Sequence, residues 1–337
     1  MTKQQRINAF VKLGELLKVQ PEDLTQIIQL AQHKNPWYTR QNVERALHAI
    51  SSNLTAEKLN HWLHNYPDIE STKTVGLILA GNIPLVGFHD ILCVLISGFK
   101  AKIKLSSDDA GLTTYVLNRL KQLEPDFAAA FEIVDKLKDF DLVIATGSNN
   151  TARYFDYYFG SKPHIIRRNR NSVAVITGQE SPAQLEALGH DIFDYFGLGC
   201  RSVSKLFIPK EYAVAHFFEG IAAYKDVSEH FKYNNNYDYN KSIYLINGDK
   251  HFDNGFLLLK QDPRMASPLS VVYYEEYNCL EDVEQELKQQ AEQIQCVVSE
   301  VPLNIQSPVF HFGESQCPAL DDYADGINTL DFLFANP

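Results

Sequence analysis

The sequence lacks the features of a membrane, secreted or zinc-binding protein. The longest apolar run of the 337 residues, Ile91 to Ile96, is far too short to span a bilayer, and the first residues hold no apolar signal core. The five cysteines are odd in number and widely scattered, so neither a disulfide framework nor a metal site is expected. A cytoplasmic protein with reduced thiols is therefore predicted.

Basic residues are also in short supply. Lys and Arg total 31 against 42 Asp and Glu, which gives a formal net charge of -11. Nonspecific nucleic-acid binding relies on basic surface, so this class of partner is excluded. The one concentrated basic run, 167–170, is short, and if it is functional we expect it to meet a single phosphate group.

The G-x-G-x-x-G fingerprint of ordinary dinucleotide folds is missing. Strand, loop and helix nevertheless repeat three times, with strands expected at 75–79, 101–105 and 142–146, which is typical of a parallel α/β sheet. Ligands bind at the carboxyl ends of such strands. The residues at those ends are Asn82, Ser106, Ser107, Gly147 and Ser148. A helix start at Gly147 and Ser148 would favour a phosphate, although a plain turn fits as well.

Hydrophobic residues at 45% and charged residues at 22% indicate a folded chain, and its length favours more than one domain. The predicted parts are a helical layer packed on the cofactor domain, a nucleotide-binding domain, a catalytic domain and a C-terminal segment, at 1–65, 66–171, 172–310 and 311–337. The polar stretch 233–240 is interpreted as a surface loop or the lining of a substrate entrance, and a strand is expected at 243–246.

One thiol has a setting that suits a nucleophile. Cys200 follows Gly197 and Gly199, and glycine leaves the backbone beside it open to close approach, so that the N–H of Cys200 would also bind an oxyanion. Cysteine is more often a core residue, and Cys93 within its apolar run fits that role. A helix N-terminus or a cation, Arg201 or Lys205, is expected to activate Cys200. No motif surrounds Cys279, Cys296 or Cys317.

Four segments together resemble the aldehyde dehydrogenase superfamily: Gly81 to Leu85, Lys104 to Ser107, Thr146 to Ser148, and Gly199-Cys200. More closely, the chain is similar to LuxC-type acyl-CoA reductases from about Asn35 to Leu333. Further segments that carry this likeness are 145–153, 196–205, 236–241 and 322–326. The resemblance implies an aldehyde-dehydrogenase-like α/β fold, with a Rossmann-type cofactor domain and an α/β catalytic domain.

The resemblance also implies roles for single residues. Cys200 would attack the thioester of a long-chain fatty acyl-CoA, while the Asn82 amide and the backbone N–H of Cys200 bind the oxyanion. Either His89 or His164 would be a candidate proton donor, a structural hydrogen-bonded histidine being the first expectation for each. The residues that would bind the nicotinamide cofactor are Lys104, Ser106, Ser107, Gly147 and Ser148.

NADPH is the expected cofactor, and no metal is needed. NAD-specific relatives often have a glutamate three residues after the lysine, where this chain has Ser107, which accommodates a 2′-phosphate. Asp108 or Asp109 would reverse this preference if its carboxylate faced the ribose.

Two positions depart from the superfamily pattern. The segment 167–171 contains no carboxylate where aldehyde-oxidising members carry the glutamate that activates water, so an acyl-enzyme would be spared hydrolysis and await reduction. The segment 267–270 differs from the Glu-x-Phe-Gly-Pro that fixes the nicotinamide ribose, so no residue is assigned to that contact.

The expected activity is reduction of a fatty acyl-CoA to the fatty aldehyde. An acyl-phosphate reductase of the glutamyl phosphate reductase type, or a noncatalytic scaffold for an acyl-transfer partner, stays open as an alternative. An acyl-protein synthetase or transferase is the expected partner, and a homo-oligomer is the expected assembly. The sequence leaves the acyl chain length and the pathway open.

Overall fold

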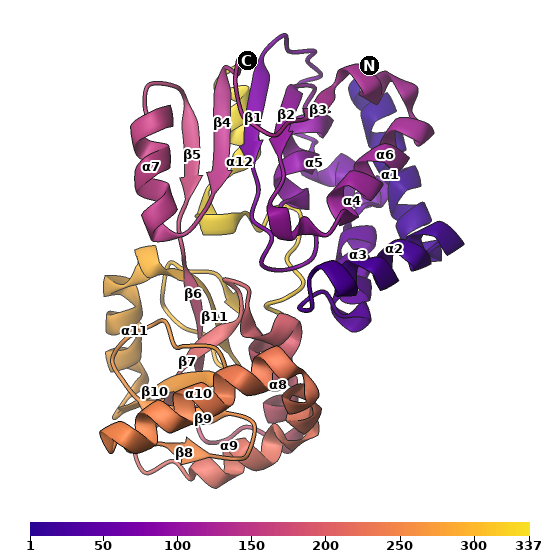
Figure 1. Cartoon of the computed structure of the whole chain (residues 1–337). Coiled ribbons are helices and arrows are strands. Elements are labelled where there is room, and N and C mark those ends of the chain that lie inside the picture. The colour runs from indigo at the N-terminus through magenta and orange to yellow at the C-terminus, as the bar shows by residue number, and fades with distance from the viewer. The chain divides into compact units, whose positions relative to one another are not determined.

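The computed structural model describes residues 1–337 apart from the side chain of Asn149. The chain divides into two compact units, Met1–Asn169 with Pro318–Pro337, and Arg170–Cys317 (Figure 1). Each unit is built around a sheet of its own, and the C-terminal segment returns to the first unit.

The sheet of the first unit is wholly parallel, in the order β3-β2-β1-β4-β5. Its strands are β1 Thr74–Ile78, β2 Lys100–Lys104, β3 Phe131–Ile133, β4 Leu142–Thr146 and β5 His164–Arg167. Strand β4 is buried from Leu142 to Ala145, as expected for a strand covered on both faces. The predicted α/β class with a parallel sheet is confirmed.

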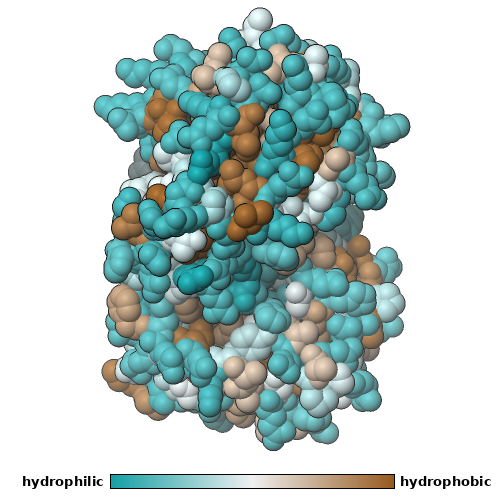
Figure 2. All heavy atoms as spheres, turned by 90° about the vertical axis from the view of Figure 1, so that its right-hand side faces the viewer, coloured by the Kyte–Doolittle hydropathy of each residue, from teal (hydrophilic) through white to brown (hydrophobic). Residues whose placement is uncertain are grey.

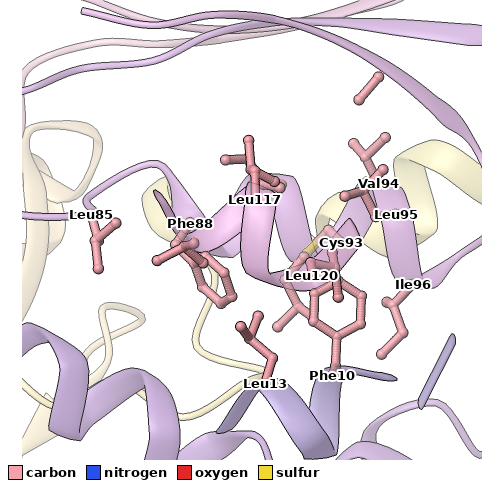
Figure 3. Packing of buried hydrophobic residues seen from close by; sticks show 14 of the residues in the cluster. Phe10, Leu13, Leu85, Phe88, Cys93, Val94, Leu95, Ile96, Leu117 and Leu120 are labelled. Carbon is pink, nitrogen blue, oxygen red and sulfur yellow. The ribbon is translucent and has the colours of Figure 1, made fainter. Parts of the chain in front are cut away.

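Helices cover both faces of this sheet. They are α1 Lys3–Val19, α2 Glu22–Lys34, α3 Arg40–Asn53, α4 Ala56–Trp62, α5 Phe88–Ile96, α6 Leu112–Leu123, α7 Asn149–Phe159 and α12 Thr329–Phe334. Side chains of α1, α5 and α6 form one apolar core with the sheet, in which Phe10 and Leu13 lie near Phe88 and Leu120 (Figure 3). On the other face, Phe155 of α7 packs against the sheet.

The helical character predicted for the first 65 residues is confirmed, and short polar side chains set the starts of these helices. The hydroxyls of Thr39 and Thr55 accept hydrogen bonds from the first turns of α3 and α4. Helix α2 follows Pro21 and begins with Glu22 and Asp23, which suit the positive end of a helix.

The second unit contains a seven-stranded sheet in the order β12-β11-β6-β7-β10-β9-β8, parallel except for the β8–β9 pair. Its strands are β6 Asn171–Val175, β7 Val203–Pro209, β8 Phe252–Asp253, β9 Leu258–Gln261, β10 Val271–Tyr277, β11 Ile294–Ser299 and β12 Val309–Phe310. Its α-helices are α8 Pro182–Phe193, α9 Val214–Gly220, α10 Phe231–Asn247 and α11 Leu280–Gln289.

Helix α10 corrects two expectations, because it replaces both the loop predicted at 233–240 and the strand predicted at 243–246. Its buried residues recur at helical spacing, as Tyr233, Tyr237, Asn240 and Tyr244. The Tyr233 hydroxyl donates to the carbonyl of Phe256 at 3.0 Å. These tyrosines therefore form core, and the alternation of apolar residues after them is not a strand pattern.

Among the described residues, no helix is both long and apolar enough to cross a membrane. The face seen in Figure 2 is mostly hydrophilic, with apolar residues in small groups.

Candidate functional site

The loop that carries Asn82 follows β1 at the carboxyl edge of the first sheet. Asn82 itself is exposed, and the loop beneath it is fixed by a buried tyrosine. The Tyr38 hydroxyl donates to the carbonyls of Gly81 at 3.0 Å and Ile83 at 3.1 Å. Burial, together with the nearby carboxylates of Asp109 and Asp108, raises the pKa of Tyr38 strongly, so its hydroxyl stays a donor at neutral pH.

Gly81 brings this loop against the loop after β2. A Cβ at position 81 would lie 2.6 Å from Ser106 Oγ and 2.7 Å from Ser106 Cβ, which only a glycine avoids. The backbone N–H of Leu79 also donates to the Lys104 carbonyl at 3.1 Å. The structure thus places Asn82 and Ser106 on adjoining loops at one edge of the sheet, where Lys104 ends β2.

The Ser106–Asp109 segment holds its own turn together. The Ser106 hydroxyl accepts from the N–H of Asp108 at 3.2 Å and caps the short helix Ser107–Asp109. The Asp109 carboxylate is buried and accepts from both the N–H and the hydroxyl of Thr113. Asp109 is therefore bound to helix α6, whereas Ser107 and Asp108 are exposed.

Gly147 and Ser148 lie between β4 and α7, at the carboxyl end of the strand beside β1. The Ser148 hydroxyl caps α7 by accepting from Thr151 N–H at 3.3 Å, so it is an N-cap residue as well as a predicted ligand. A Cβ on Gly147 would lie 3.0 Å from the Phe155 ring. The neighbouring strands β1 and β4 thus both end in site candidates, at the place where this type of sheet binds ligands.

Cys200 is exposed and lies just before the amino end of β7 in the second unit. The backbone leading to it makes a left-handed turn, with φ of 54° at Tyr195, 59° at Phe196 and 76° at Gly197. The turn is closed by a hydrogen bond of 3.1 Å from Leu198 N–H to the Tyr195 carbonyl. Aromatic residues rarely adopt the left-handed backbone conformation, because this conformation costs a residue with a Cβ on the order of 1–2 kcal/mol. Tyr195 and Phe196 both adopt it here.

Sequence reasoning missed Ser172, which supports the Cys200 loop. Its hydroxyl is fully buried in β6 and donates to the Cys200 carbonyl at 3.0 Å. The Ser172 oxygen also lies 3.0 Å from the buried Cys296 sulfur, which leaves the Cys296 thiol as donor in that contact. No sequence signal marks Ser172, since a serine at the start of a strand is common.

Lys205 does not supply the activating cation that was expected beside Cys200. Its ammonium group is fully buried, bonded to the Glu275 carboxylate and the Pro263 carbonyl, and lies 3.4 Å from a Glu286 oxygen. A buried lysine is stable only when it is paired in this way. Lys205 is therefore a core ion-pair residue.

Arg167 and Arg168 of the basic run 167–170 form ion pairs within the protein. Arg167 is buried, donates to both carboxylate oxygens of Asp90, and reaches the Ala324 carbonyl and the Thr329 hydroxyl of the C-terminal segment. Arg168 pairs with Asp156 at 2.8 Å. The phosphate contact considered for this run is not supported for Arg167, whose guanidinium is already fully engaged.

The two candidate histidines have structural partners, in line with the first expectation. His89 Nε2 lies 2.9 Å from the Leu320 carbonyl, and since a carbonyl only accepts, this nitrogen carries the proton. His164 Nδ1 lies 2.8 Å from the Lys162 carbonyl, and His164 begins β5, at the edge of the sheet opposite to the strand ends that carry the other candidates. Cys93 is fully buried, which raises the pKa of its thiol, and its sulfur lies among apolar side chains (Figure 3).

The described residues contain no cluster of three His, Cys, Asp or Glu side chains that would hold a metal ion. The predicted site residues divide between the units: Asn82 and the cofactor candidates belong to the first and Cys200 to the second. Within the first unit the structure does bring its predicted residues together.

The chain is similar to solved aldehyde dehydrogenases. An NAD-dependent enzyme from Sinorhizobium meliloti matches at 13% identity with a TM-score of 0.66, covering 92% of this chain and 74% of that one. Aldehyde dehydrogenase 21 from Physcomitrella patens, solved with its reaction product succinate, matches at 14% identity with a TM-score of 0.70, covering 99% and 84%. These likenesses confirm the aldehyde dehydrogenase fold.

Indole-3-acetaldehyde dehydrogenase AldA from P. syringae, in complex with NAD+ and IAA, matches at 14% identity with a TM-score of 0.64, covering 89% of this chain and 72% of that one. No curated protein matches the chain. The acyl-CoA reductase family LuxC matches residues 11–229. Since this match spans more than half of the sequence, the chain belongs to the LuxC family of acyl-CoA reductases.

Proposed function

We propose that this chain reduces a long-chain fatty acyl-CoA to the aldehyde with NADPH, through an acyl-enzyme on Cys200. Membership of the LuxC family makes it an oxidoreductase that acts on an acyl or aldehyde group. The observation that carries the proposal is the exposed Cys200 thiol, held after a glycine-containing left-handed turn and directly before β7.

In the first half-reaction, the Cys200 thiolate attacks the thioester carbonyl carbon and a new C–S bond forms. The tetrahedral oxyanion is held by the Asn82 side-chain amide and the backbone N–H of Cys200. Its collapse breaks the bond to coenzyme A, whose thiolate takes up a proton as it leaves. The acyl group is thus transferred from the sulfur of coenzyme A to the sulfur of Cys200.

The nicotinamide, when bound, supplies the hydride that reduces the acyl carbon. The resulting thiohemiacetal oxyanion on Cys200 would be held by the same two donors. Its collapse breaks the C–S bond, releases the aldehyde and returns the Cys200 thiolate. The summed reaction consumes one acyl-CoA, one NADPH and one proton, and yields aldehyde, coenzyme A and NADP+.

The carboxyl edge of the first sheet fits a nucleotide. Lys104 and Ser106 adjoin the Asn82 loop, and the first turn of α7 at Gly147 and Ser148 presents backbone N–H groups suited to phosphate. Among the structural neighbours, the AldA complex contains NAD+. We assign these loops to binding the adenosine and pyrophosphate of the cofactor.

The preference for NADPH rests on the surroundings of Ser107. The Asp109 carboxylate is buried and bonded to Thr113, so it does not face the ribose and would not repel a 2′-phosphate. Asp108 is exposed and is the remaining carboxylate next to Ser107. Replacing Ser107 by glutamate should move the preference toward NADH. If Ser107→Glu leaves the ratio of NADPH to NADH turnover unchanged, the 2′-phosphate does not bind there.

The decisive experiment gives the purified protein acyl-CoA and NADPH, and follows cofactor absorbance and free thiol together. Wild type should oxidise NADPH and release the free thiol of coenzyme A in equal amounts. Cys200→Ala should abolish both, and should also lose the acyl adduct seen by mass spectrometry without cofactor. Cys279→Ala, which removes another exposed thiol, should retain the adduct. An adduct that persists in Cys200→Ala would overturn the role of Cys200.

The alternative hypothesis of an acyl-phosphate reductase is tested in the same assay. An acyl phosphate offered in place of acyl-CoA should react more slowly, and the reverse order would select that alternative. A protein that binds no nicotinamide cofactor by calorimetry would instead fit the noncatalytic scaffold.

A further inference from the structure

We propose that Phe196, His230 and Phe231 form the surface that receives the acyl chain of the substrate and sets its preferred length. This inference rests on the proposed function, because it takes Cys200 as the site of acylation. All three residues belong to the second unit, as does Cys200.

The first observation is the conformation of Phe196. It is half-buried, four residues before Cys200, with φ of 59° in the left-handed turn. Glycine adopts this conformation without penalty, whereas a bulky aromatic residue is disfavoured there. An aromatic residue at such a position indicates that its ring is needed where the turn directs it.

The second observation is where that ring lies. Phe196 contacts His230, with ring centroids 4.3 Å apart, and His230 in turn is stacked with Phe231 at 5.5 Å and an interplanar angle of 23°. The Phe231 ring is 57% exposed at the start of α10. Three rings in sequence therefore lead from the backbone of the Cys200 loop to solvent.

Two of the three rings, those of Phe196 and His230, are held in place by neighbouring residues. His230 Nδ1 accepts from the Tyr233 N–H at 3.4 Å and so caps α10. Tyr233 is buried, lies 6.3 Å from the Phe196 ring, and donates its hydroxyl to Phe256. Since α10 positions His230 and the turn positions Phe196, these two rings are in place before substrate binds.

The chemistry of these rings selects the acyl part of the substrate over the CoA part. Coenzyme A carries phosphates, which need cations or N–H donors, whereas an alkyl chain needs apolar surface. Each methylene moved out of water onto such a surface contributes about 0.8 kcal/mol, or roughly fourfold in affinity. A row of rings that begins four residues before the reacting thiol thus favours long chains over short ones.

The test compares tetradecanoyl-CoA with butanoyl-CoA as substrates of Phe196→Ala, Phe231→Ala and the control Phe252→Ala, an exposed phenylalanine on β8. The first two variants should lose about tenfold in kcat/KM for the long chain and less than about twofold for the short one. The control should match wild type with both substrates. Acylation of Cys200 without cofactor, followed by mass spectrometry, should show the same pattern.

The outcomes separate the two hypotheses. If wild type reduces neither acyl-CoA and Cys200 is not acylated, the proposed function fails and this inference fails with it. If wild type is active and both ring variants affect the two substrates equally, or affect neither, only the acyl surface is overturned. Phe231 is exposed, so Phe231→Ala keeps the test valid if Phe196→Ala does not fold.

Discussion

The Asn82 loop and the Cys200 loop are positioned in opposite ways. The first follows a strand, at the carboxyl end of β1, and neighbouring elements hold it through Tyr38 and the Gly81–Ser106 contact. The second precedes a strand, at the amino end of β7, and is shaped by its own backbone in a left-handed turn. One site loop is thus a product of sheet topology, and the other a product of local conformation.

Among the substitutions that test this comparison, removal of the Asn82 amide should lower turnover the most. Loss of one oxyanion donor typically lowers kcat by about 10²- to 10³-fold. Asn82→Ala should show this loss in steady-state turnover and a matching slowing of Cys200 acylation, because the same donor serves both steps. Cofactor affinity, measured by calorimetry, should stay within about twofold. If the turnover of Asn82→Ala stays within threefold of wild type, Asn82 is not an oxyanion donor.

Asp191 allows a pH-dependent test of the stability of the second unit, to which the Cys200 loop belongs. It is fully buried near the end of α8, and accepts from the N–H groups of Gly313 and Ser315 and from the Ser315 hydroxyl. Burial raises the pKa of Asp191 to about 6, against these hydrogen bonds, which lower it. The folded state therefore keeps a proton that the unfolded state has released above its ordinary pKa of about 3.9.

The sign follows from this difference in bound protons. The contribution of Asp191 to stability is fully present below about pH 4 and is lost as pH rises through about 6. Urea unfolding should show the free energy of unfolding of wild type falling by on the order of 3 kcal/mol relative to Asp191→Asn from pH 4 to 7. Parallel pH profiles for the two proteins would show that Asp191 does not titrate in this range.

The same comparison explains what the sequence alone revealed. Asn82, Ser106 and Gly147 follow apolar strand-like runs, and parallel topology then puts them at one edge of the sheet. Cys200 was predicted from its glycines and from the family resemblance, but nothing in the sequence indicates that Tyr195 and Phe196 adopt positive φ.

Long-range partners account for the other misses. Lys205 was expected to act on the neighbouring thiol, yet its charge meets Glu275 and Glu286, which lie on β10 and α11. Helix α10 was mistaken for a loop and a strand because its polar residues hid a helical spacing of buried tyrosines. Two of these tyrosines pack against Leu258 of β9 and Tyr273 of β10, so in both cases the partners that decide the structure lie on other elements.

Gly81→Ala should break the contact between the two loops at the cofactor edge. The new Cβ would lie 2.6 Å from Ser106 Oγ, and such overpacking typically costs about 1–3 kcal/mol. Urea unfolding should show this loss, cofactor affinity should weaken because Ser106 is displaced, and acylation of Cys200 should slow because position 81 directly precedes Asn82. Ser106→Gly in the same chain should restore part of the lost stability. Absence of any coupling between the two substitutions would contradict the contact.

The smallest effects come from two matched hydroxyl deletions. Tyr38→Phe removes the donor to Gly81 and Ile83, and Ser172→Ala removes the donor to the Cys200 carbonyl. Each loss is worth about 1 kcal/mol, or roughly fivefold. Tyr38→Phe loosens the Asn82 loop, so it should weaken cofactor binding in calorimetry and also slow acylation in mass spectrometry, whereas Ser172→Ala should slow acylation and spare cofactor binding. If Ser172→Ala also weakens cofactor binding, the two loops are not held independently, and the contrast between topology and local conformation fails.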